Sequence, residues 1–293
     1  MEPTLLYWTL PGPAADLDGH VALCREAERL GVHSVLVPFA PAGPDPFAWA
    51  AALGRRTGRI GFLLECLAGV SSPTYWTQQA NTLAAVLGGR VGVVVAAGWE
   101  PVRQLGYGDG ILSDGWYARL DEFWQVCHGL WRGPEPVSLA GRHYQIDSAT
   151  VNARFVSGGP LERPEISVTG PFPPALAFAS RHADCVFVQA EEPEEQVAAV
   201  LDSGLRAGLA VPPYGIADAT VPPRGIADAT VPPRGIADET AAVIGRGRAA
   251  GATRFLMSGD IERLRWFGAE ILPRIRSAVH NDAGQPMEGD TRS

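Results

Sequence analysis

The chain contains no lysine, so all 24 of its basic residues are arginines. This absence excludes Schiff-base catalysis by lysine and the lysine-dependent phosphate loop of P-loop proteins. The 32 acidic residues give a net charge of −8, and the sequence has no basic patch or tail. This charge balance argues against nucleic acid and against an anionic membrane as partners.

Several other common signatures are missing. No run of 18 apolar residues occurs, and the N-terminus lacks a charged-then-apolar signal pattern, so we expect a cytoplasmic protein without membrane contact. The four cysteines (Cys24, Cys66, Cys127 and Cys185) form no Cys-x-x-Cys pair and are predicted to be buried free thiols. The six histidines show no metal-ligand spacing, so no metal site is expected.

What the chain does have is an alternation of short apolar runs and amphipathic helical segments. Strands are predicted over residues 5–10, 33–39, 59–66, 91–96, 165–169, 185–190 and 254–257. Helical patterns lie between most of them, and the one near residues 116–131 carries apolar side chains every three to four positions. Apolar strands that alternate with helices predict a parallel sheet with helical crossovers.

About eight such units predict an α/β protein with a (β/α)₈ TIM-type barrel, in a single domain over residues 1–280. The polar residues 281–293 are predicted to be a disordered tail. The rival fold is a doubly wound open sheet, which would show a glycine fingerprint after an early strand. The turn after the first predicted strand reads Pro11-Gly12-Pro13, which does not match that fingerprint.

One segment breaks the alternation, because residues 211–240 consist of three similar ten-residue units (VPPYGIADAT, VPPRGIADAT and VPPRGIADET). Each Pro-Pro pair excludes a helix interior and disfavours a central strand. A duplicated loop is one interpretation, and a short strand or cap formed by each IADAT is the other. In both cases we expect the seventh barrel unit to be abnormal or missing.

Five segments together resemble one family. They are VGVVVAAGWE from Val91, YARLDEFWQVCHGLWRG from Tyr117, GRHYQI from Gly141, RPEISVTG from Arg163 and ASRHADCVFV from Ala179. Their order and spacing resemble the luciferase-like flavin-dependent monooxygenases and related deazaflavin-dependent oxidoreductases, and among them the alkanesulfonate monooxygenases. The resemblance covers residues 4–206 and 236–277. It implies a barrel that works as a homodimer on a small organic substrate, using O₂ and reduced FMN from a separate flavin reductase.

The resemblance also implies a set of cofactor-binding residues at the C-terminal ends of the strands. Those candidates are Ala97, Gly98, Trp99, Tyr117, Gly170, Gln189 and Ser258. Trp8 and Phe39 are candidates for a substrate pocket, and Glu65 and Cys66 are weak catalytic candidates. A structural role remains the alternative for each: a tight turn at residues 97–99, a rim-packed Tyr117, or a solvated Glu65.

Two departures from the family pattern leave three functions open. The loop after the predicted strand 165–169 contains Pro171, Pro173 and Pro174, which remove three N–H donors where the family has a glycine-rich phosphate loop. The ten-residue repeats also replace a longer family segment. The first hypothesis is a monooxygenase that uses reduced FMN. The alternatives are a catalytically inactive flavin-binding or partner protein of the same fold, and a deazaflavin-dependent oxidoreductase.

Overall fold

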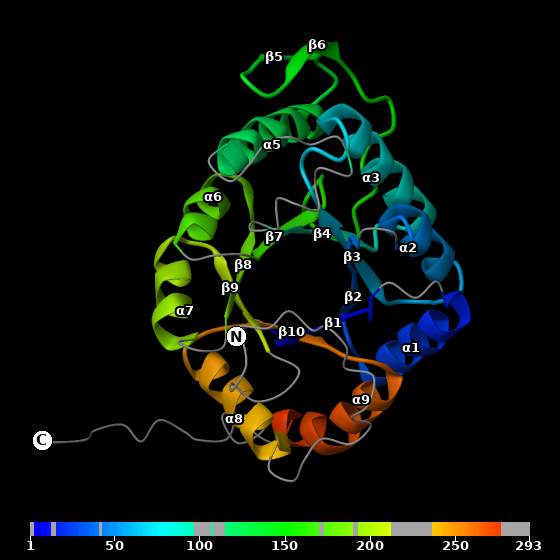
Figure 1. Ribbon diagram of the computed structural model, residues 1–293, viewed down its shortest axis with the longest axis vertical. Coiled ribbons are helices and arrows are strands. Elements are labelled where there is room, and N and C mark those ends of the chain that lie inside the picture. The colour runs from blue at the N-terminus through cyan, green and yellow to red at the C-terminus, as the bar shows by residue number, and fades with distance from the viewer. Residues whose placement is uncertain are drawn as a thin grey trace, which may run out of the picture.

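A computed structural model describes residues 3–12, 16–40, 43–96, 107, 115–169, 173–189, 193–211 and 236–276. Eight parallel strands close into a barrel, which Figure 1 shows as a ring of strands inside a ring of helices. In order around the ring, the strands are β1 (Leu5–Thr9), β2 (Ser34–Val37), β3 (Gly61–Cys66), β4 (Val91–Ala96), β7 (Glu165–Thr169), β8 (Cys185–Gln189), β9 (Arg206–Ala210) and β10 (Arg254–Ser258). The predicted fold class is confirmed.

Helices cover the outside of this barrel. They are α1 (Leu17–Leu30), α2 (Pro46–Gly54), α3 (Pro73–Leu87), α5 (Trp116–Arg132), α6 (Pro174–His182), α7 (Pro193–Asp202), α8 (Ile236–Ala249) and α9 (Ile261–Trp266), which continues into the π-helical segment η3 (Phe267–Ile271). Local sequence sets their ends: Asp16 caps α1 by accepting the Gly19 N–H, and Gly31 ends it with a φ of 82°. No described helix is both long and apolar enough to cross a membrane.

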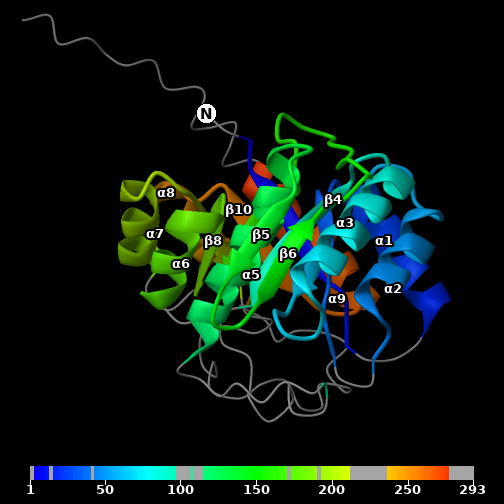
Figure 2. The ribbon, with the colours of Figure 1, turned by 90° about the horizontal axis from the view of Figure 1, so that it is seen from above.

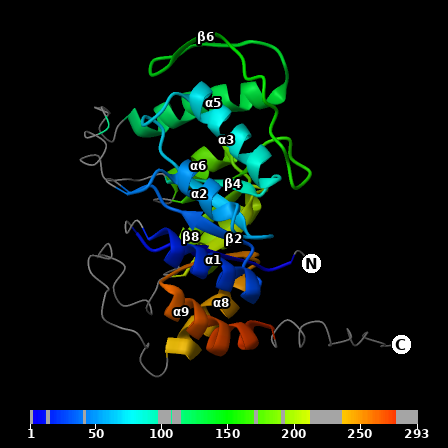
Figure 3. The same cartoon turned by 90° about the vertical axis from the view of Figure 1, so that its right-hand side faces the viewer.

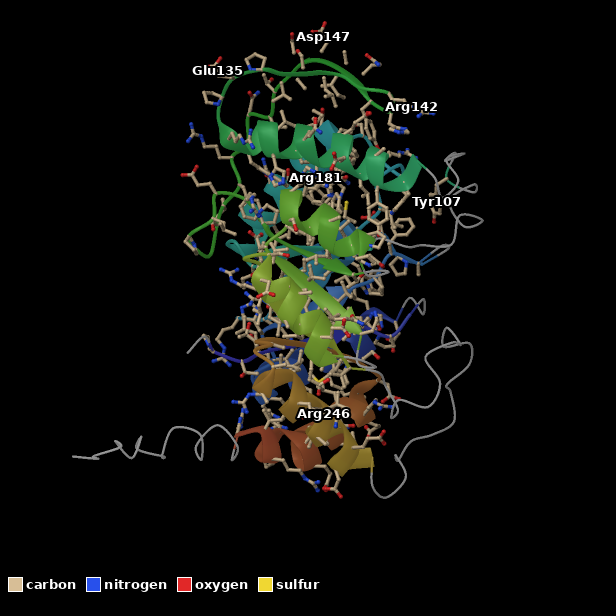
Figure 4. All side chains as sticks on the ribbon, turned by 90° about the vertical axis from the view of Figure 1, so that its left-hand side faces the viewer. Tyr107, Glu135, Arg142, Asp147, Arg181 and Arg246 are labelled. Atoms are coloured by element: carbon tan, nitrogen blue, oxygen red, sulfur yellow. The ribbon has the colours of Figure 1, made fainter. Side chains whose placement is uncertain are left out.

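A small hairpin lies outside the barrel. Strands β5 (Val137–Ala140) and β6 (Gln145–Ala149) pair antiparallel and lie on the outer side of α5 (Figures 2 and 3). The carboxylate of Glu122 on α5 holds the hairpin turn by accepting the backbone N–H groups of residues 142, 143 and 144. Figure 4 shows Glu135, Arg142 and Asp147 at the outer edge, directed away from the barrel.

The seventh barrel unit is present. Strand β9 pairs in parallel with β8 and β10, and α8 supplies the helix that follows. The prediction had placed no strand at residues 206–210, and its version with a missing seventh unit is wrong. Residues 212–235, which carry most of the ten-residue repeats, lie outside the described residues, as does the predicted tail.

The strand side chains alternate between the barrel interior and the helix layer. At mid-height the interior is filled by an apolar plug made of Tyr7, Leu36, Leu63, Val94, Cys185, Phe187 and Leu256. A separate, larger apolar cluster lies between the strands and the helices. We call the C-terminal ends of the strands the mouth and the N-terminal ends the base, and the plug lies between them.

Candidate functional site

Glu65 lies at the mouth, at the end of β3. It is two residues past the plug residue Leu63, so its side chain also faces the barrel interior. Its Oε2 atom accepts a hydrogen bond of 2.7 Å from the backbone N–H of Phe39. Burial raises the pKa of this carboxyl to about 7, and the Phe39 hydrogen bond offsets only part of that rise. Within the described part of the chain it forms no salt bridge that would lower this pKa, so the carboxyl exchanges its proton near pH 7.

Tyr117 lies in the first turn of α5, the helix that leaves the mouth side of the barrel. Its ring packs 6.3 Å from that of Phe178 on α6, measured between centroids. Its hydroxyl is buried and has no hydrogen-bond partner within the described ranges, and burial raises its pKa. A buried hydroxyl normally has a partner, so this one is a ready donor for a bound group.

Tyr117 packs against α6 through the Phe178 ring, and the first turn of this helix offers further donors. Pro173 and Pro174 open the helix and lack N–H groups, as the sequence indicates. The first helical hydrogen bond runs from Ala177 N–H to Pro173 O, so the amides of Ala175 and Leu176 precede the intrahelical pattern. A helix start of this kind favours an anion. The described prolines therefore remove two N–H donors from this helix start and leave the amides of Ala175 and Leu176.

The remaining described candidates divide between the mouth and its rim. Gln189 and Ser258 occupy inward positions two residues beyond plug residues on β8 and β10, so both lie at the mouth. Phe39 follows β2 beside Glu65, and its ring lies 5.2 Å from that of Tyr107; Figure 4 labels Tyr107 beyond the strand ends. Their cofactor and substrate roles stay predictions.

Two candidates are corrected by the alternation of strand side chains. Cys66 is adjacent to Glu65, so it faces the opposite way, into the helix layer near Cys127, with 1% of its surface exposed. Burial raises the pKa of its thiol well above the usual range, which leaves it protonated and out of reach of the mouth.

Trp8 likewise points out of the barrel. It alternates with the plug residue Tyr7, and its ring packs edge-on against Phe267 at 5.7 Å. Its indole N–H donates to the carbonyl of Gly259 at 2.9 Å. Trp8 therefore belongs to the packing between the barrel and α9, and it does not line a substrate pocket inside the barrel.

Four candidates lie outside the described residues, namely Ala97, Gly98, Trp99 and Gly170. Sequence reasoning also missed an interior group at the base, in which Arg254 donates to Glu165 at 2.7 Å and to the Tyr7 hydroxyl. A signal for it existed: both Arg254 and Glu165 are charged residues that begin otherwise apolar strands.

The barrel and its mouth can be compared with those of known families. The closed parallel barrel with polar groups at its mouth is the architecture of (β/α)₈ enzymes, whose active sites lie at that end. The model of the luciferase-like monooxygenase family matches residues 6–225, so the chain belongs to that family.

Solved structures with the same fold include flavin- and F420-dependent enzymes. EDTA monooxygenase from Chelativorans sp. BNC1 matches with a TM-score of 0.73 and 15% identity, over 95% of both chains. A riboflavin lyase, solved with modified FMN and riboflavin, matches with a TM-score of 0.75 and 15% identity, over 95% of this chain and 92% of that one. An F420-dependent secondary alcohol dehydrogenase matches with a TM-score of 0.72 and 18% identity, over 94% of this chain and 100% of that one.

Proposed function

We propose that this protein is a flavin-dependent monooxygenase that uses reduced FMN and O₂ on a small organic substrate at the mouth of the barrel. The observation that carries the proposal is the buried Tyr117 hydroxyl, which has no hydrogen-bond partner among the described residues and belongs to a ring packed against Phe178 of α6. Membership of the luciferase-like monooxygenase family supports the reaction class.

Tyr117 and α6 fit the phosphate group of FMN. The hydroxyl would donate to a phosphate oxygen, and the amides of Ala175 and Leu176 would add two donors at the positive end of the helix dipole. When bound, the reduced flavin supplies the electrons with which O₂ reacts. In this proposal a separate flavin reductase delivers it, and the chain works as a homodimer.

Glu65 supplies a proton-handling group on the interior wall of the mouth. With its pKa raised to about 7, this carboxyl can either donate or accept a proton near neutral pH. The Phe39 N–H holds Oε2, and in this proposal Oε1 exchanges the proton with the substrate. Below it, the apolar plug closes the barrel to water from the base.

A second candidate function is an oxidoreductase that uses the deazaflavin F420. One observation favours it: an F420-dependent secondary alcohol dehydrogenase shares the fold over 94% of this chain. A group that exchanges a proton near pH 7, such as Glu65, suits the oxidation of an alcohol as well as an oxygenation.

Titration of the full chain with reduced FMN, oxidised FMN and F420 tests both candidates. We expect saturable binding of reduced FMN, which Tyr117→Phe weakens about tenfold by removing one hydrogen bond to a charged group. Tyr75→Phe is the matched control, because Tyr75 is 55% exposed on α3, and it should leave the affinity unchanged.

Each outcome of the titration decides between the functions. Tight binding of F420 with none of FMN would favour the oxidoreductase. If FMN binds but none of a panel of sulfonates and alkanes is oxygenated in the presence of reduced FMN and O₂, the chain is an inactive flavin-binding protein. Absence of binding by every flavin would overturn the proposal.

A further inference from the structure

A cavity lies at the base of the barrel, on the far side of the plug from the mouth. Its volume is about 410 Å³, and it extends from the plug residues Tyr7 and Leu63 to the exposed rim residues Arg59 and Gly158. Barrels usually fill this level with bulky branched side chains. Here the inward positions of β2, β3 and β4 at the base carry only Ser34, Gly61 and Gly92, which leaves the space open.

The wall of this cavity carries more positive than negative charge. Five arginines line it, and they are Arg59, Arg90, Arg163, Arg206 and Arg254. Among the described lining residues, Glu165 supplies the one carboxylate, and it is shared by Arg206 at 3.3 Å and Arg254 at 2.7 Å. Arg163 pairs with Asp184, a residue just behind the wall, at 2.7 and 2.8 Å.

The two remaining arginines lie on the side of β3 and β4. Arg90 donates to the backbone carbonyls of residues 54, 60 and 87, and its guanidinium lies 6.0 Å from the ring of Phe62, which faces the helix layer. Among the described residues it has no carboxylate salt bridge, so it adds uncompensated positive charge behind the cavity wall. Arg59 is exposed at the rim, where its charge interacts electrostatically with the Glu28 carboxylate. The guanidinium groups therefore outnumber the carboxylates around the cavity, which favours an anionic occupant.

Two other polar groups of the wall are neutral. Burial lowers the pKa of His33 and raises that of the Tyr7 hydroxyl, so near pH 7 neither adds charge. Apolar surface from Phe155 and Leu161 completes the lining. A space of about 410 Å³ with both cationic and apolar walls is much larger than one inorganic ion needs and is typical of small-molecule pockets.

We propose that this basal cavity binds a small organic anion that carries a carboxylate or phosphate group. The arginines hold the charged group, and Tyr7, Phe155 and Leu161 contact its carbon skeleton. Because the apolar plug separates the base from the mouth, this ligand binds independently of any flavin or substrate at the other end. The proposal thus goes beyond the proposed oxygenase function and does not depend on it.

Isothermal titration of the full chain at low ionic strength tests the proposal. The probes are citrate for a carboxylate, 3-phosphoglycerate for a phosphate ester, inorganic phosphate for the bare ion, and glycerol for an uncharged skeleton. We expect saturable one-to-one binding of at least one of the two organic anions, at least tenfold tighter than inorganic phosphate, and none of glycerol. The organic anion that binds more tightly identifies the charged group.

Two arginine variants locate the site. Arg59→Ala should weaken binding about tenfold, because it removes a rim cation without disturbing a buried pair. The matched control is Arg246→Ala on α8, a half-exposed arginine paired with Glu194 (Figure 4), which should leave binding unchanged. Both arginines are exposed, so melting temperatures close to that of the parent protein verify folding.

The proposal is overturned by any of three results: no saturable binding of either organic anion at millimolar concentration, equal effects of the two arginine variants, or inorganic phosphate binding as tightly as the organic anions. Saturating the protein with FMN first should leave the organic-anion affinity unchanged. Competition between the two would place the anion at the mouth and also overturn the proposal, whereas a failure to bind FMN bears only on the proposed function.

Discussion

The two ends of the barrel each carry a glutamate inside the wall, and their surroundings differ. At the mouth, Glu65 accepts one backbone N–H and forms no salt bridge within the described ranges, so burial raises its pKa to about 7. At the base, Glu165 is paired with Arg206 and with Arg254, which is 5% exposed. The same side chain thus has a pKa near neutrality at one end and is a structural counter-charge at the other. The difference teaches that counter-charges, rather than residue type, decide the role.

The largest expected effect comes from removing the counter-charge at the base. Glu165→Gln leaves the buried Arg254 guanidinium without its carboxylate, and we expect it to lower the free energy of unfolding by about 3 kcal/mol. Urea denaturation at pH 7 measures this change. The control is Glu135→Gln on the exposed hairpin segment (Figure 4), expected to change stability by less than about 0.5 kcal/mol. Equal effects of the two variants would contradict the assignment.

The same substitution at the mouth should act in the opposite direction. The pKa of Glu65 is about 7 in the folded protein and lies above the ordinary glutamate value of 4.5, so the contribution of its protonated form to stability is complete below pH 4.5 and is lost as pH rises through 7. Glu65→Gln has no carboxyl to ionise, so it does not lose stability in this pH range. Relative to the parent protein, its stability should therefore rise by about 2 kcal/mol between pH 5 and pH 8.

Urea unfolding of both proteins at pH 5, 6, 7 and 8 measures this difference, in which the other carboxyl groups cancel. A stability difference that stays constant with pH would show that the Glu65 carboxyl ionises normally in the folded protein.

A pair of tyrosines gives the smallest test of the comparison. At the base the Tyr7 hydroxyl accepts a hydrogen bond from Arg254, so Tyr7→Phe should cost about 1 kcal/mol of stability. At the mouth the Tyr117 hydroxyl is buried and has no partner in the part of the chain that the structure describes, so Tyr117→Phe should leave stability unchanged or raise it by up to about 1 kcal/mol in the flavin-free protein. Thermal denaturation of the two variants side by side checks this, and a destabilised Tyr117→Phe would contradict it.

Much of the barrel could be predicted from the sequence because its strands are short apolar runs with turn residues at both ends. Strand β9 escaped prediction because its sequence, RAGLA, has small residues and no β-branched side chain. Its strand conformation comes from pairing with β8 and β10 on either side. Such long-range pairing leaves no local signal in the sequence.

The errors at the candidate site have a different cause. Adjacent residues of a strand face opposite sides, so Glu65 and Cys66 cannot both face the mouth. The strands of a parallel barrel are apolar on both faces, so the sequence does not show which set of alternate residues points inward. The structure shows which alternate residues point inward. Glu65 is one of them and stays a candidate, whereas Cys66 and Trp8 face the helix layer.

The basal cavity was also beyond sequence reasoning, because it depends on which residues meet across the barrel. Gly61 and Gly92 read as ordinary strand glycines, and Arg254 and Glu165 are 89 positions apart in the chain. Only closure of the ring brings their side chains together.

The apolar plug has a consequence for how this protein can be altered. Its seven side chains place a layer of low polarity between two polar chambers that share the same eight strands. Substitutions at the two ends that do not touch a common plug residue should therefore have additive effects on the free energy of unfolding. Evolution or protein engineering could therefore change residues at the mouth while the basal cavity keeps its properties, and the reverse also holds.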